Sequence, residues 1–354
     1  MKKRLAYLLF IAAILVGGCN NGVVTPPVVG SITHVGSPLA YVNDVETSDG
    51  ASLFRGSTVS TDGSGSVSLG LHVKDFLCNL LSDSRLQVEP DGETVVSWIA
   101  GEAMCATSGG AGTCHTLTAN KTTVDLVDPV FAVIVRGADD TVKVSRGFVR
   151  VGSLATGGTV ILGPGQQTVI AAGQSPLPPM PIELTVLEQQ LFDELNPRFI
   201  APEFGQPADF SKSVTLTRIF ERGVILASVD VAQLQNEPAY WFAGQMLDLL
   251  AQAWGVKVDM RELRPEEAQQ QMEASELDLL ISPQAFDQLA GIPFFQEKGS
   301  GSWALLFLED ESFRHGLEAF LRVAIERTDY AGLYMEAFGE SPSYQAFEEF
   351  LFRP

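Results

Sequence analysis

The sequence has few positive charges for its length. Of its 354 residues, 23 are Lys or Arg and 43 are Asp or Glu, which gives a formal net charge of −20. Nucleic acid and anionic lipid headgroups carry negative charge themselves, so a chain this acidic is unsuited to bind either of them through charge. We therefore expect no nucleic-acid partner, and a strongly hydrated protein surface.

The sequence motifs of common enzymes are also lacking. We find no G-x-S-x-G nucleophile elbow, no H-E-x-x-H zinc motif and no phosphate-binding P-loop. Histidine is scattered along the chain, at His34, His72, His115 and His315. The adjacent carboxylates of Asp139 and Asp140 are typical of a solvated turn. These absences predict a protein that is not an enzyme, with no catalytic residues and no cofactor.

Cysteine is scarce: the chain has Cys19, Cys78, Cys105 and Cys114. Cys105 and Cys114 flank a Gly/Ser-rich turn between two strand-like segments, so they would lie opposite each other across a hairpin. We predict a disulfide between these two. The last three cysteines nevertheless allow three pairings, and each pairing leaves one cysteine over.

Two metal sites can be considered, and neither has the spacing that its metal requires. A zinc site from Cys78, Cys105, Cys114 and His115 would lack a CxxC pair, and adjacent side chains on a strand point to opposite faces. A calcium site from Asp139 and Asp140 with Asp125 or Asp128 lacks the spacing of a calcium-binding loop. We therefore predict no metal.

Long apolar runs are absent except near the first residue. Lys2-Lys3-Arg4 precedes the apolar stretch 5–16, and small residues lead up to Cys19. This stretch is too short for a comfortable membrane span and indicates a signal peptide. Its LVGGC ending resembles the bacterial lipobox, which implies lipid modification of Cys19, membrane attachment through that lipid and a protein body outside the cytoplasm. The alternative is an ordinary secretory signal with a chance cysteine.

Composition then changes along the chain. Short Val-rich segments separated by Gly, Asp and Ser indicate an all-β domain, and residues 129–152 predict a meander of three short strands. A Pro-rich segment and an amphipathic helix over 183–195 follow, and strand–helix alternation after residue 213 predicts an α/β layer with a largely parallel sheet. We divide the chain into a signal peptide 1–18, a tether 19–38, a β domain 39–173, a Pro-rich linker with a helix 174–213, and an α/β lobe 214–354.

The β domain carries a series of motifs in a fixed order. They are residues 56–61 (GSTVST), 65–71 (GSVSLGL), 135–137 (VRG), 146–151 (RGFVRV) and 162–166 (LGPGQ). This series resembles the FecR-type periplasmic domains of regulators that pass a signal from an outer-membrane receptor to a sigma factor. That mechanism needs a spanning helix, and this chain has a lipobox instead. The resemblance therefore implies a binding or scaffolding domain, and Arg136, Asp139 and Asp140 are the residues where we expect a partner.

The α/β lobe carries a second series of motifs. They are residues 222–224 (RGV), 244–248 (GQMLD), 255–258 (GVKV), 276–281 (ELDLLI) and 292–295 (IPFF). This series is similar to the family 3 extracellular solute-binding proteins of ABC transporters, which are two-lobed clamps. Here only residues 296–302 (QEKGSGS) stand where the second lobe would be. Residues 282–291 also lack the Arg that the family uses to bind a ligand carboxylate, so we predict a single lobe.

Four residues of the lobe are candidates for ligand contact. Tyr240, Trp241 and Phe242 come before the helix expected from residue 244, where the related family often has a ring that stacks on its ligand, and Asp248 lies within that helix. The alternative is that the aromatic residues belong to the core. We predict a non-enzymatic, lipid-anchored adaptor that binds an unidentified protein, glycan or small molecule. The alternative is a transport receptor for amino acids or similar solutes.

Overall fold

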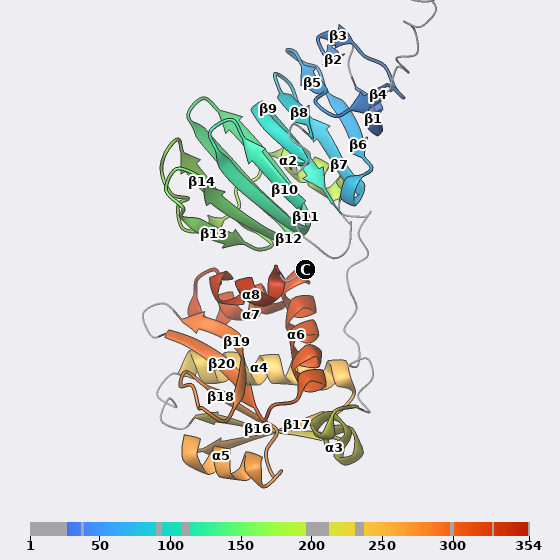
Figure 1. Cartoon of the computed structure of the whole chain (residues 1–354). Coiled ribbons are helices and arrows are strands. Elements are labelled where there is room, and N and C mark those ends of the chain that lie inside the picture. Colours follow the sequence, from blue (N-terminus) through green and yellow to red (C-terminus); the bar gives the residue numbers. More distant parts are fainter. Residues whose placement is uncertain are drawn as a thin grey trace, which may run out of the picture.

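The computed structural model describes residues 27–36, 39–89, 94–107, 114–195, 212–230, 237–297, 301–327 and 329–352. The chain forms two modules: the β module (residues 27–195) and the α/β module (residues 212–352) (Figure 1). The expected multidomain arrangement, β-rich followed by α/β, is confirmed at this level. The signal peptide, Cys19 and the connector 196–211 lie outside the described residues. None of the described helices is long and apolar enough to cross a membrane.

The β module is built on one hydrogen-bonded sheet of 15 strands. Its main path runs in the order β15-β14-β12-β11-β10-β9-β7-β6-β1-β4, and β2, β3, β5, β8 and β13 pair beside this path. The elements are β1 Val28–Val35, β2 Ala40–Val42, β3 Val45–Glu46, β4 Ser52–Phe54, β5 Thr58–Thr61, β6 Val67–Leu71, η1 Val73–Asp75, β7 Phe76–Leu80, β8 Arg85–Val88, β9 Val96–Ala106, β10 Cys114–Thr118, β11 Thr122–Arg136, β12 Asp139–Ser153, β13 Thr159–Leu162, β14 Gln166–Ala171 and β15 Met180–Pro181.

The expected meander over 129–152 is instead one long hairpin of β11 and β12. A two-residue turn joins the strands, with Gly137 at a φ of 63°, a conformation that favours glycine. Ser145-Arg146-Gly147, expected as a second turn, does not break β12. The pairing shifts there, from Phe131 opposite Val144 to Val130 opposite Arg146, which is a β-bulge. The bulge keeps the strand continuous, so the prediction of three short strands was wrong.

Strand β1 lies in the stretch expected to be a tether. It pairs with both β4 and β6, and its residue Ile32 is buried in the core of the module. A strand that gains partners on both sides has its backbone groups satisfied, which compensates for its weak alternation of apolar residues. The sheet therefore begins before residue 39.

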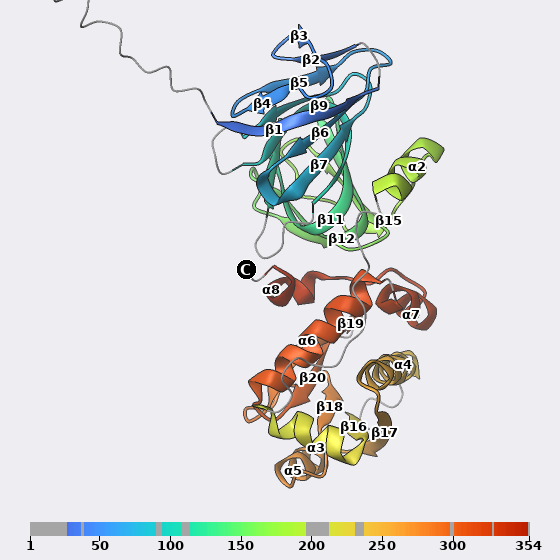
Figure 2. The ribbon, with the colours of Figure 1, turned by 90° about the vertical axis from the view of Figure 1, so that its right-hand side faces the viewer.

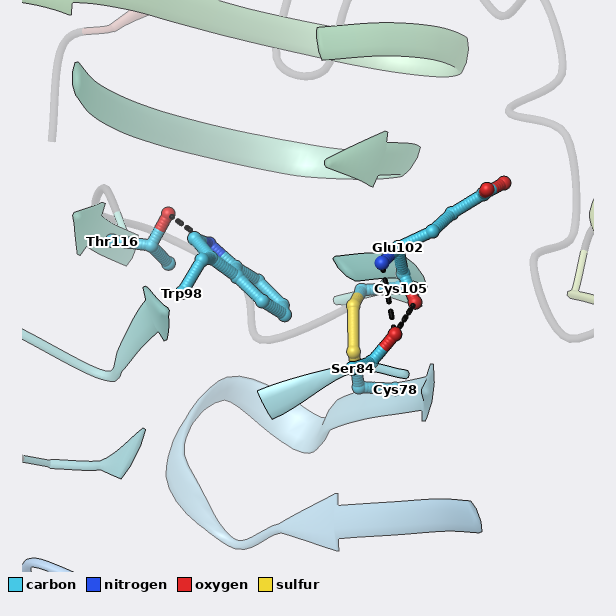
Figure 3. Close-up of a disulfide and its surroundings, with 6 residues drawn as sticks. All are labelled: Cys78, Ser84, Trp98, Glu102, Cys105 and Thr116. Carbon is cyan, nitrogen blue, oxygen red and sulfur yellow. Dashed lines mark hydrogen bonds between the residues drawn. A yellow bond between two sulfur atoms is a disulfide. The ribbon is translucent and has the colours of Figure 1, made fainter. Parts of the chain in front are cut away.

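The disulfide joins Cys78 and Cys105, so the predicted pair of Cys105 with Cys114 was wrong. Cys78 on β7 lies directly opposite Cys105 on β9 in the sheet (Figure 3). Cys114 lies on β10, where its register partner is Leu126. The hairpin expected between the two later cysteines does not form, because β9 and β10 run parallel.

Helix α2 (Val186–Leu195) corresponds to the amphipathic helix expected over 183–195, and it packs on the outer face of the sheet (Figure 2). Thr185 and Glu188 cap its first turn reciprocally, at 2.6 Å and 3.2 Å. The Lys143 ammonium on β12 donates to the Glu188 carboxylate at 2.5 Å, and this ion pair is nearly inaccessible to solvent. The apolar contact is made by Met104, Ala106, Val130, Ala132, Phe192 and Leu195.

The α/β module has a five-stranded sheet in the order β17-β16-β18-β20-β19. The pairs β17–β16 and β16–β18 are parallel, whereas β18–β20 and β20–β19 are antiparallel, so the sheet is less parallel than expected. Its elements are α3 Val214–Arg222, β16 Val224–Asp230, α4 Glu237–Trp254, β17 Lys257–Leu263, α5 Pro265–Glu273, β18 Leu279–Ser282, β19 Ala290–Glu297, β20 Gly301–Phe307, α6 Glu311–Glu326, α7 Asp329–Phe338, η5 Gln345–Phe347 and α8 Glu348–Leu351.

A buried carboxylate ties the first helix of this module to its sheet. Asp278 precedes β18, and its side chain is completely inaccessible to solvent. It accepts hydrogen bonds from the guanidinium groups of Arg218 and Arg222 on α3, and from the backbone N–H of Leu226 on β16 at 2.8 Å. The buried negative charge is therefore matched by two positive charges and a backbone donor.

The two modules meet at the module junction, where the segment after α7 packs on β12, β13 and β14. The ring of Tyr344 packs edge-on against Phe148, with the ring centroids 5.6 Å apart. The Gln166 side-chain amide donates to the Pro342 carbonyl at 2.7 Å, and Arg150 Nη1 donates to Glu348 Oε1 at 3.0 Å. Both views place α8 directly beneath the β module (Figures 1 and 2).

Candidate functional site

The carboxyl ends of two neighbouring parallel strands carry buried polar residues. Asp230 ends β16 and Ser282 ends β18, and both are completely buried. The Ser282 hydroxyl donates to Asp230 Oδ2 at 3.3 Å. In open α/β sheets, ligands bind outside the carboxyl ends of the strands, so this is the place in the module where a small ligand is expected. We call it the carboxyl-edge site.

Tyr240, in the first turn of α4, lies at the same edge of the sheet as the carboxyl-edge site. Its side chain is half-buried, and its hydroxyl is hydrogen-bonded to Glu262 near the end of β17. Burial raises the pKa of Tyr240, and the charge and hydrogen bond of Glu262 raise it further. Glu262 lies opposite Val229, the residue before Asp230, so Tyr240 and Glu262 lie at the same edge of the sheet as Asp230 but on its other face. This edge of the sheet therefore carries carboxylates and hydroxyls on both faces, and such groups suit the amine or hydroxyl groups of a ligand.

The other three residues predicted for ligand contact lie elsewhere. Helix α4 begins at Glu237, earlier than expected, so the aromatic residues are helical. Phe242 is completely buried and its ring contacts five others, those of Phe294, Phe295, Tyr330, Tyr334 and Phe338. Trp241 is half-buried against the same core. Asp248 is exposed about two turns further along the helix, roughly 12 Å from Tyr240. Only Tyr240 reaches the carboxyl edge.

The turn between β11 and β12 holds the residues predicted for partner contact, and they differ in exposure. Arg136 is exposed, and its guanidinium lies 3.5 Å from the Glu102 carboxylate. Asp139 is exposed as well. Asp140, expected in a solvated turn, is completely buried, where it accepts hydrogen bonds from Thr118 Oγ1 at 2.5 Å and Asn120 Nδ2 at 2.8 Å. Asp140 is therefore a structural tie to β10 and is inaccessible to a partner.

Asp125, considered as a calcium ligand, is engaged with other side chains. Its carboxylate accepts from Arg150 Nε at 2.9 Å and Nη2 at 2.8 Å, and it lies 2.5 Å from His115 Nδ1. Among the described residues, no group of three or more His, Cys, Asp or Glu side chains could hold a metal ion. Asp125 instead connects β11 to the arginine of the module junction.

A groove beside α2 was missed by sequence reasoning. It has a volume of about 780 Å³ and lies between α2 and the neighbouring outer face of the sheet. Its floor comes from β1, β6 and β7, and its wall from α2. Residues distant in the sequence meet here, so no local sequence pattern indicates the groove. We call it the α2 groove. It is lined by His34, Gly36, Ser64, Gly65, Ser66, Val67, Ser68, Asn79, Leu80, Leu81, Ser82, Asp83, Gly101, Glu102, Val135, Arg136, Leu187, Leu191 and Glu194.

Comparison with known proteins finds weak similarity to two kinds of solved structure. A candidate anti-sigma factor from Parabacteroides distasonis is 16% identical, with a TM-score of 0.33, over 49% of this chain and 77% of its own. The arginine-bound form of domain 1 from TmArgBP is 14% identical, with a TM-score of 0.24, over 31% of this chain and 96% of its own. No family model and no curated protein matches the chain. At these scores the similarity identifies neither a family nor an activity.

Proposed function

We propose that this chain is a non-enzymatic binding or adaptor protein, held outside the cytoplasm by a lipid on Cys19. The β module serves as a platform for a partner, as its resemblance to FecR-type domains implies. The α/β module is a solute-binding lobe that no longer encloses a solute.

One observation carries this proposal: β19 and β20 form a direct hairpin. Their pairing runs to Glu297 opposite Gly301, so only residues 298–300 stand between the strands in the sequence. In the two-lobed proteins that this module resembles, a whole second lobe would begin at this point. A ligand on one lobe stays exposed to water on its other side, which weakens the binding of a small polar solute.

The disulfide supports the proposed location. Cys78 and Cys105 are both buried and directly opposed in the sheet. Structural disulfides form and persist in oxidising compartments and are rare in the cytoplasm. A Cys19→Ser variant is expected to leave the membrane fraction and to appear in the soluble extracytoplasmic fraction. Unchanged membrane retention of this variant would contradict a lipid anchor on Cys19.

The transport receptor is the second candidate, because two buried polar residues, Asp230 and Ser282, end neighbouring parallel strands at the carboxyl-edge site. A receptor would be stabilised by its solute, by about 2.7 kcal/mol at a concentration 100 times the dissociation constant. Thermal unfolding of the whole chain should be measured with amino acids and polyamines, with Asp230→Ala as the control.

The adaptor proposal expects the same unfolding temperature with every solute of this panel. A solute that stabilises the wild type but not the Asp230→Ala variant would replace the adaptor function with solute reception. Binding at the edge would then involve the buried carboxylate directly.

A further inference from the structure

Among the described residues, the outer face of the β-module sheet is covered by α2 and, at β12, by the segment after α7. Helix α2 covers it at β9 and β11, and the Lys143–Glu188 ion pair holds the start of the helix in place. Beyond α2, a row of residues crosses the same face: Met104 lies opposite Asn79, Asn79 opposite Ser68, and Ser68 opposite His34. Met104 is buried under α2, whereas the rest of the row forms the floor of the α2 groove.

The floor of the groove is low because its side chains are small. Serine and glycine predominate along the β6 side, at residues 64–66 and 68. The opposite wall is a stripe on α2 formed by Leu187, Leu191 and Glu194, which are spaced so that they share one helix face. Leu187 is 54% exposed, although it is a large apolar side chain. The groove therefore pairs an apolar wall with a polar floor.

The charge of the groove is mainly negative. Asp83, Glu102 and Glu194 line it, against Arg136 and His34. Arg136 already faces Glu102 at 3.5 Å, and His34 lies 3.8 Å from Asp49. The side chain of Glu102 is only 18% exposed. Burial and the nearby Glu188 raise the pKa of Glu102, so its carboxylate gains from a further positive charge.

We propose that the α2 groove docks a basic amphipathic peptide segment of a partner protein. Apolar side chains of the segment rest on Leu187 and Leu191, and its Lys or Arg side chains reach Glu194 and Glu102. The volume of about 780 Å³ accommodates a short stretch of peptide. This inference rests on the proposed adaptor function. It specifies the surface to which the partner binds and the charge of the partner segment.

Two other occupants fit the groove less well. Among the residues that line it there is no Phe, Tyr or Trp, the side chains on which a glycan would stack. A second copy of this chain would bring another net charge of −20 to a surface that is already negative. A basic segment instead complements the groove in both charge and apolar pattern.

The test uses a fluorescein-labelled Lys/Leu peptide of about twelve residues, patterned as an amphipathic helix roughly 18 Å long. Binding to the whole chain is measured by fluorescence anisotropy. Matched variants separate the groove from the general acidity of the protein. Glu194→Lys faces the groove, whereas Asp193→Lys makes the same charge change on the next residue, which is exposed and does not line the groove. Leu187→Ser lines it, and Val186→Ser, at a residue 79% exposed, does not.

We expect Glu194→Lys to weaken binding about tenfold and Leu187→Ser about fivefold, with changes under about twofold for both controls. The proposal is overturned if each groove variant and its control lose affinity equally, if a Glu/Leu peptide binds as tightly as the Lys/Leu peptide, or if no binding is detected. A dimer in sedimentation that Glu194→Lys dissociates would assign the groove to a second copy instead. These outcomes leave the Cys19→Ser fractionation and the solute panel unchanged, so failure here is distinct from failure of the adaptor function.

Discussion

The two modules are held together in different ways. The β module is cross-linked: one disulfide joins β7 and β9, and the buried side chain of Asp140 ties β12 to the β10 end. The α/β module has no disulfide among its described residues. It is stabilised by a cluster of aromatic rings around Phe242 and by the hydrogen bonds that the buried Asp278 carboxylate accepts. A cross-linked sheet resists local unfolding. An aromatic core that contains tyrosine hydroxyls is destabilised by conditions that ionise those hydroxyls. The modules should therefore fail under different conditions.

The largest effect is expected from Asp278→Ala. The substitution leaves the guanidinium groups of Arg218 and Arg222 without their shared carboxylate, and should cost about 3–5 kcal/mol of folding free energy. The loss should be confined to the α/β module, as resolved by hydrogen exchange of peptides from each module. Asp259→Ala is the control, because Asp259 forms an exposed pair with Arg261 at 3.3 Å and should cost under about 1 kcal/mol. Equal losses of stability in the two variants would show that the buried Asp278 carboxylate stabilises the module no more than an exposed ion pair does.

The next effect is expected in the β module alone. Replacing Cys78 and Cys105 together with Ala should lower its stability by about 2–4 kcal/mol, because the unfolded chain is no longer cross-linked. Chemical denaturation of the oxidised protein measures this difference. Cys114→Ala should leave stability nearly unchanged. A large loss of stability in the Cys114 variant would instead indicate that Cys105 pairs with Cys114.

A smaller effect tests the contact between the modules. A Cβ on Gly163 would lie 2.2 Å from the ring of Tyr344, so Gly163→Ala should push the ring away at a cost of about 1–3 kcal/mol. Small-angle scattering should then show a more extended molecule. Gly165→Ala meets nothing within 4 Å, and should keep the compact shape despite some strain at its φ of 75°. An unchanged scattering profile for Gly163→Ala would mean that the modules are joined by other contacts.

The smallest effect concerns alkaline pH and the α/β module. Burial, with the charges of Glu340 and Glu297, raises the pKa of Tyr334 to about 12. An unfolded tyrosine titrates near pH 10, so the folded state holds this proton more tightly. The resulting stability is complete below about pH 10 and is lost as the pH rises toward 12. Burial raises the pKa of Tyr330 and Tyr344 in the same direction.

Tyr334→Phe isolates this contribution. It removes the hydrogen bond to the Gln296 carbonyl, 2.5 Å long, and should cost about 0.5–1.5 kcal/mol at neutral pH. Above pH 10 the variant should lose less stability than the wild type, as measured by denaturation at several pH values. A decline as steep as that of the wild type would show that Tyr334 does not titrate in this way.

Local patterns predicted helix α2 and the later part of α4, because amphipathic spacing acts over a few positions. Helix α2 lies close to its expected position, whereas α4 begins before residue 244. The cysteine pairing could not be predicted from local patterns, because it depends on β7 and β9 becoming neighbours in the sheet. Asp140 is buried only because Thr118 and Asn120 reach it from β10 and the turn that follows. Each of these features arises from pairing between distant segments.

The sequence does contain a pattern that indicates the carboxyl-edge site. Asp230 and Ser282 each follow a run of buried apolar residues, and a polar residue at the end of a buried parallel strand is a candidate for ligand contact. The α2 groove left no comparable signal. It requires strands from the start of the β module beside a helix near its end.

The bulge in β12 reverses which residues of this strand face outward. Lys143, on the outer side, reaches α2, and by simple alternation Val149 and Val151 would follow it outward. They are instead in the inner core, and Phe148 and Arg150 face the α/β module. The extra residue thus changes the parity of the strand, so that one strand holds α2 and, about 23 Å further along, the second module. Because the bulge places two residues where its partner strand has one, deleting Ser145 would remove the bulge and keep Lys143, Phe148 and Arg150 on the outer side by plain alternation.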